Sequence, residues 1–186
     1  MGIIIFIVIL AALAGYIIFI YNTLIRRKNL VAEGWSGIDV QLKQRSNLIP
    51  NLIEAVKGYM SHERNVLENI TELRSQCLSA KNMKTREQNE NMLTSALRQL
   101  FALSENYPNL KASENFIDLQ NTLTKIEDQI QMSRRYYNGT VRDLNITIQS
   151  FPSNLIAKAF KFQQADFFEI DTAQDKEVPK VDFEQS

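Results

Sequence analysis

The sequence predicts an all-α protein in which an N-terminal transmembrane helix is followed by an elongated antiparallel bundle of three long helices and a short C-terminal helix. Residues 2–21 carry no charged side chain, and a basic cluster at 26–28 follows them. After this cluster, apolar residues recur with the 3.5-residue spacing of packed helices. No section of the chain shows a series of strand-like alternations.

The N-terminal apolar run predicts a membrane anchor. Its twenty residues form a helix about 30 Å long, which matches the hydrocarbon core of a bilayer. Thirteen of them are Ile, Leu, Val or Phe, and they favour insertion by about 4 to 8 kcal/mol. The alternative is a cleaved signal peptide, since Ala12-Leu13-Ala14 resembles a cleavage site. We expect a retained anchor, because no basic residue precedes the run and the run exceeds the usual apolar region of a signal.

The basic cluster predicts the orientation. Arg26, Arg27 and Lys28 lie only on the C-terminal flank of the run, and such residues stay on the cytoplasmic side. We therefore expect a single-pass protein of the inner cell membrane, with its N-terminus outside and its C-terminal domain in the cytoplasm. The three side chains are candidate contacts to lipid headgroups.

The chain is expected to divide into an anchor at 1–21, a cytoplasmic helical bundle at 22–160 and an acidic, partly ordered tail at 161–186. The first helix of the bundle follows an apolar seam that Arg45 and Glu63 interrupt. Pro50 lies within this seam and removes a helical hydrogen bond, so we predict a kink or a restart near Ser46-Asn47.

The bounds of the later helices are predicted from polar stretches, prolines and capping residues. A polar stretch at 79–91 is predicted to be a loop or a frayed turn, and a second helix then runs to Tyr107-Pro108. The third helix spans about 113–149, where apolar residues recur every seven positions. Phe151-Pro152 ends it, and Ser153-Asn154 can cap a short fourth helix that reaches Phe160.

Composition and motifs argue against catalysis. The formal net charge is zero, with 21 basic and 21 acidic residues, so no field favours nucleic acid. His62 is the only histidine, and a zinc-protease motif would need a second one where Val66 stands. We expect no catalytic, cofactor-binding or metal-binding residue. The alternative, an accessory enzyme or metal site built around His62, Glu63 and Cys77, stays open.

Several polar and aromatic residues near the seams are candidates for packing or for interaction. Trp35 and Tyr137 fall at seam positions, whereas Tyr136 can face a partner. Short polar groups there either pair across helices to fix the register or line a groove that grips a partner. The candidates are Trp35, Asp39, Asn47, Pro50, Asn51, His62, Glu63, Asn115, Gln120, Tyr136, Tyr137 and Asn138.

Ordered sequence blocks over nearly the whole chain resemble the LemA family of bacterial membrane proteins. They are Tyr21-Asn22-x-Leu24, Trp35-Ser36-x-Ile38-Asp39-Val40-Gln41-Leu42-Lys43, Arg45-x-x-Leu48-Ile49-Pro50-Asn51-Leu52, Lys57-Gly58-Tyr59-x-x-His62-Glu63, Glu105-x-Tyr107-Pro108-x-Leu110-Lys111-Ala112, Asn115-Phe116-x-x-Leu119-Gln120, Tyr137-Asn138, Phe151-Pro152-Ser153-Asn154 and Val181-x-Phe183. The resemblance implies a single span, an outward N-terminus and a helical cytoplasmic bundle. It transfers no catalytic residue, because the family has no established biochemical activity.

The sequence thus favours a membrane-anchored, non-enzymatic scaffold or adaptor that binds an unidentified protein partner at the cytoplasmic face. An anionic-lipid-sensing envelope component is a further alternative to the enzyme or metal site. The sustained apolar seams also permit a homo-oligomer.

Overall fold

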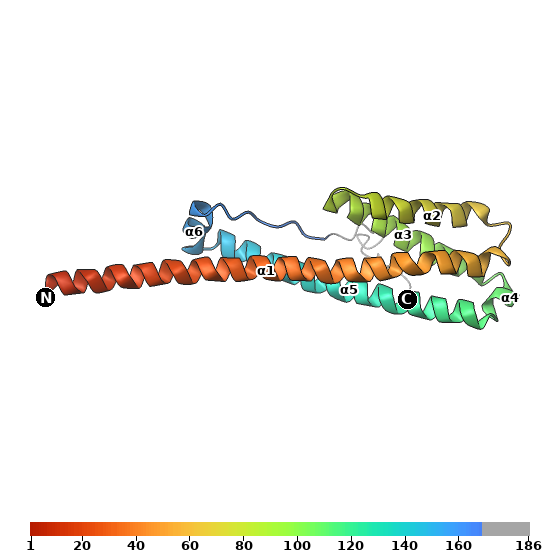
Figure 1. Ribbon diagram of the computed structural model, residues 1–186, viewed down its shortest axis with the longest axis horizontal. Coiled ribbons are helices and arrows are strands. Elements are labelled where there is room, and N and C mark those ends of the chain that lie inside the picture. Colours follow the sequence, from red (N-terminus) through yellow and green to blue (C-terminus); the bar gives the residue numbers. More distant parts are fainter. Residues whose placement is uncertain (169–186) are drawn as a thin grey trace, which may run out of the picture. The chain divides into compact units, whose positions relative to one another are not determined.

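The computed structural model describes residues 1–168, and all regular secondary structure in that range is helical (Figure 1). The helices are α1 (Gly2–Lys57), α2 (Arg64–Ser79), α3 (Met83–Ser104), α4 (Pro108–Lys111), α5 (Glu114–Gln149) and α6 (Ser153–Ala159). The predicted all-α class is confirmed. Of the acidic tail predicted for 161–186, the part from position 169 onward lies outside the described residues.

The described chain forms two compact units. Residues 1–56 and 112–168 make up the first, which contains α1, α5 and α6. Residues 57–111 make up the second, which contains α2, α3 and α4.

α1 is a single helix of 56 residues that runs from the apolar N-terminus to Lys57. The predicted restart near Ser46-Asn47 is wrong, because Pro50 lies inside the uninterrupted helix. Pro50 is exposed, whereas Ile49 and Leu52 beside it are buried. Burial of these two side chains contributes about 1.5 to 3 kcal/mol each, which offsets the cost of about 3 kcal/mol for an internal proline.

The first part of α1 has the properties of a membrane span. Among the described helices, α1 is the one that is long and apolar enough to cross a bilayer. Only 6% of its most apolar stretch is buried within the protein, unlike the core helix of a soluble domain. The apolar surface is therefore available to lipid.

α1 and α5 run antiparallel. Arg27 of α1 pairs with Asp143 of α5 at 2.6 Å, and Arg45, further along α1, pairs with Glu127 at 2.6 Å. Positions thus rise along one helix as they fall along the other. α5 begins after Ser113 and ends at Gln149, which confirms the predicted third helix.

The chain turns at the end of α5 and packs α6 back onto α1. The Phe151–Pro152 peptide bond is cis, and α6 follows it. Ala157 of α6 forms a buried apolar cluster with Ile20 and Leu24 of α1. The predicted short fourth helix is confirmed, and it ends in a Schellman-type turn: Phe162 N–H donates to the Ala157 carbonyl at 2.9 Å.

In the second unit, α2 and α3 pack against each other. The predicted loop at 79–91 is wrong from Met83 onward, where α3 begins. Asn82 caps this helix, because its side-chain oxygen accepts a hydrogen bond from Thr85 N–H at 2.8 Å. Glu87 and Glu90 are buried in the first turns, so the helix begins without the apolar pattern that would reveal it.

Candidate functional site

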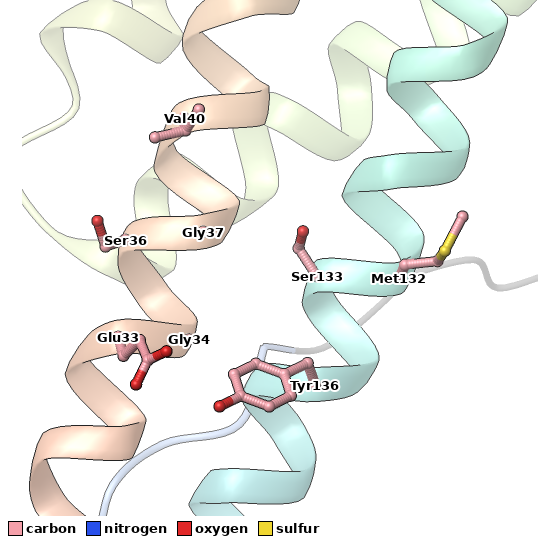
Figure 2. Close-up of a pocket in the computed structure, with 8 residues that line it drawn as sticks. All are labelled: Glu33, Gly34, Ser36, Gly37, Val40, Met132, Ser133 and Tyr136. Carbon is pink, nitrogen blue, oxygen red and sulfur yellow. The ribbon is translucent and has the colours of Figure 1, made fainter.

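An open groove lies between α1 and α5, with a volume of about 640 Å³. Figure 2 shows the Tyr136 ring reaching from α5 toward Glu33 and Gly34 of α1. The lining residues are Glu33, Gly34, Ser36, Gly37 and Val40 of α1 and Met132, Ser133 and Tyr136 of α5.

Two glycines give the groove its shape. A Cβ on Gly34 would lie 3.1 Å from the Tyr137 Cα, so the absence of a side chain there permits the close approach of the helices. A Cβ on Gly37 would meet no atom within 4 Å. Gly34 therefore serves packing, whereas Gly37 leaves space in the groove.

The wall of the groove carries apolar, hydroxyl and carboxylate side chains. Val40, Met132 and Tyr136 on its wall are each about half exposed. Among the lining residues, Glu33 carries the one carboxylate, and the serines and Tyr136 supply hydroxyls.

On α5 next to the groove, two asparagines bind an extended segment of the chain. Asn138 Nδ2 donates to the Phe168 carbonyl at 2.9 Å, and Phe168 N–H donates to Asn138 Oδ1 at 2.8 Å. Asn145 makes the same pair of hydrogen bonds with Ala165, both at 2.9 Å. We call these four hydrogen bonds the asparagine clamp.

Aromatic and cationic groups hold the end of the clamped segment. The Phe168 ring lies 6.0 Å from Trp35 and 4.4 Å from the Arg134 guanidinium carbon. The Tyr137 hydroxyl donates to the Asp166 carbonyl at 3.0 Å, and its ring lies 5.8 Å from Trp35. Phe168 is thereby buried.

The structure brings together Trp35, Tyr137 and Asn138 of the predicted candidates, and it places Tyr136 on the groove. Sequence reasoning missed the clamping role of Asn145 and the contacts of Arg134 and Phe168. The signal available for Asn145 was its spacing of seven residues from Asn138, which places both on one face of a helix.

The remaining candidates of the first unit differ in their exposure. Asp39 and Gln120 are half-buried. Asn47, Pro50, Asn51 and Asn115 are exposed.

The residues of the enzyme or metal alternative are separated. His62 is exposed in the turn before α2, and Cys77 is buried near the end of that helix. Fourteen residues separate Glu63 from Cys77 along helical chain, which corresponds to about 21 Å. Within residues 1–168, no group of three or more His, Cys, Asp or Glu side chains is arranged to hold a metal ion.

Glu63 instead contacts Tyr107, whose hydroxyl donates to Glu63 Oε1 at 3.3 Å. The pKa of Tyr107 is raised above its ordinary value. The largest cause is loss of hydration, and the negative charge of Glu63 and its hydrogen bond to the hydroxyl add to it.

The basic cluster after the anchor has two environments. Arg26 and Lys28 are exposed. Arg27 is engaged with Asp143, so α5 neutralises one of the three charges expected at lipid headgroups.

Comparison with known proteins shows the family of the chain. The Protein LemA of Metamycoplasma hominis is 27% identical over 177 residues, which cover 92% of this chain and 78% of that protein. The magnetosome protein MamQ 2 of Paramagnetospirillum magneticum is 22% identical over 184 residues, covering 85% of this chain and 68% of that protein. The sequence model of the LemA family matches residues 34–183. The chain belongs to the LemA family of membrane-associated proteins.

Proposed function

We propose that the protein is a membrane-anchored, non-enzymatic adaptor that presents the groove between α1 and α5 to a protein partner in the cytoplasm. The observation that carries this proposal is the set of half-exposed apolar side chains, Val40, Met132 and Tyr136, around an open groove. Exposed apolar surface bordering a groove is typical of protein interaction sites.

The partner that fits is a helix or loop with a small set of apolar side chains. Such a segment can place them against Val40 and Met132 while its polar groups reach the serines and Glu33. The open space over Gly37 accommodates a side chain from the partner.

Photo-crosslinking in intact membranes tests the proposal. A photoreactive phenylalanine analogue replaces Val40 in the full chain, and mass spectrometry identifies what becomes attached. The matched control carries the same analogue at Ile117, an exposed apolar position of α5 outside the groove. We expect a reproducible cytoplasmic protein at Val40 that is missing at Ile117.

A second variant distinguishes docking from chance proximity. Gly37→Leu adds a side chain at a position where a Cβ meets no neighbour. With the helical content of the variant checked by circular dichroism, we expect the crosslink from Val40 to disappear. Equal products at Val40 and Ile117 would contradict the proposal. Crosslinks exclusively between copies of the chain would replace the adaptor with a homo-oligomer.

Labelling tests the orientation separately. Tyr136→Cys in a Cys77→Ala background places an accessible thiol on the groove. A membrane-impermeant maleimide should label it after permeabilisation and not in intact cells. Labelling in intact cells would place the domain outside.

A further inference from the structure

The turn between α5 and α6 lies level with the end of the anchor. The antiparallel pairing of Arg27 with Asp143 implies that Gln149, at the end of α5, faces the last turn of the apolar run. Direct contacts agree with this placement, since the Tyr21 ring lies 4.8 Å from Phe160 and 6.0 Å from Phe162. Figure 1 shows α6 beside the anchor half of α1.

This region exposes more large apolar surface than a short helix in water ordinarily does. Phe151 is 80% exposed, Leu155 59% and Phe160 54%. Near the end of the apolar run, Ile18 and Phe19 of α1 are also exposed. Exposed apolar surface of this kind marks a membrane or protein contact.

The charge of the same region has one sign. Residues 1–32 and 144–165 contain no Asp or Glu. Arg27 is paired with Asp143, and the other basic residues of these ranges are Arg26, Lys28, Lys158 and Lys161. Lys158 and Lys161 are both exposed. Anionic headgroups at a bilayer surface attract such a cluster.

We propose that residues 150–162 form a second membrane contact, in which Phe151, Leu155 and Phe160 enter the interfacial layer and the two lysines reach anionic lipid headgroups. This contact is independent of the docking groove. Apolar side chains of interfacial elements bury to a depth of about 5 to 10 Å, while lysine stems extend their charge toward the headgroups. A bilayer is the occupant that matches both the position beside the anchor and the charge.

Depth measurement on the full chain tests this proposal. An environment-sensitive fluorophore is attached at Leu155→Cys in the Cys77→Ala background, with one copy per nanodisc of phosphatidylcholine and phosphatidylglycerol. A nitroxide on the shallow part of the acyl chains quenches a label in the interface. The control label at Ile117→Cys lies on α5, whose start is far from the membrane end by the antiparallel register.

We expect the nitroxide to reduce the fluorescence of the label at Leu155 and to leave the fluorescence of the label at Ile117 unchanged. Phe151→Cys should behave like Leu155→Cys, which guards against a folding defect in one variant. Equal, weak quenching at Leu155 and Ile117 would overturn the proposal. So would a blue shift that occurs solely when two copies share a disc, because a second copy would then cover the surface.

Lipid charge tests the role of the lysines. Replacing phosphatidylglycerol with phosphatidylcholine should reduce quenching at Leu155, and the Lys158→Glu/Lys161→Glu variant should lose this dependence. The Lys125→Glu variant, at an exposed position in the first half of α5, should keep this dependence. Quenching that ignores lipid charge in the unaltered chain would overturn the assignment of the lysines to headgroups.

Discussion

Asn138 and Asn145 lie seven residues apart on α5 and bind backbone groups of residues three apart in an extended segment. Seven helical residues rise about 10.5 Å, and three extended residues span about 10 Å. The spacing of the two asparagines therefore matches the spacing of their partners, so each side-chain amide bonds to both the N–H and the carbonyl of one residue. This match explains how side chains on a helix can hold a backbone that has no strand partner.

Removal of either clamp amide should release the segment from α5. Asn138→Ala leaves the Phe168 N–H and carbonyl without their partners, at a local cost of about 1 to 3 kcal/mol. Hydrogen exchange at the Phe168 amide should accelerate accordingly. Asn115→Ala, at an exposed position, should leave that rate unchanged. Unaltered protection in Asn138→Ala would mean that the hydrogen bonds do not hold the segment.

The two groove glycines should respond oppositely to alanine. Gly34→Ala forces a Cβ against the Tyr137 backbone, so we expect a net loss of about 1 to 2 kcal/mol in the free energy of unfolding. Gly37→Ala meets open space and should gain about 0.5 to 1 kcal/mol from helix propensity. Denaturant unfolding of the detergent-solubilised protein, followed by circular dichroism, measures both. The same sign for both variants would contradict the assigned roles.

The Arg45–Glu127 ion pair should be costly to break and inexpensive to replace. The Arg45 side chain is 1% exposed and that of Glu127 22%. Glu127→Gln removes the carboxylate charge that is paired with the buried guanidinium, so we expect a loss of about 3 kcal/mol. Arg45→Met combined with Glu127→Met should recover most of this loss in the same unfolding measurement. Arg27→Ala, which breaks a half-exposed pair, should cost no more than about 1 kcal/mol.

Tyr107 should make the second unit sensitive to alkaline pH. Its pKa is raised in the folded protein, so the folded state holds this proton more tightly than the unfolded chain does. The contribution to stability is complete below the unfolded pKa of about 10 and is lost as pH rises through the folded value. The free energy of unfolding should therefore fall less steeply with increasing pH for Tyr107→Phe than for the unaltered chain. Tyr59→Phe, at an exposed position, should follow the unaltered chain.

Prediction from the sequence succeeded where apolar periodicity and a terminating residue agree. α5 was predicted almost to its ends, because its heptad pattern runs unbroken from Phe116 to Leu144 and Phe151-Pro152 follows. α1 and α3 were harder for opposite reasons. In α1, Pro50 led to the prediction of a break where the helix is continuous. In α3, the first turns bury Glu87 and Glu90, so no apolar pattern indicates where the helix begins.

The groove and the clamp could be predicted in part only. Tyr136 and Asn138 were candidates by their place near a seam, but the pairing of Gly34 with Tyr137 depends on helix register, which a single sequence does not define. Asn145 gained its role from a segment twenty residues further along the chain. Local patterns contain no information about that contact.

Because α1 is one continuous helix, it limits the distance between the groove and the membrane. No flexible linker separates Tyr21, at the end of the apolar run, from Val40 on the groove, and nineteen helical residues measure about 28 Å. A tilted helix would bring Val40 closer to the bilayer, but it could not carry it further away. If the groove binds a partner as proposed, the binding segment of that partner has to come within this distance of the bilayer.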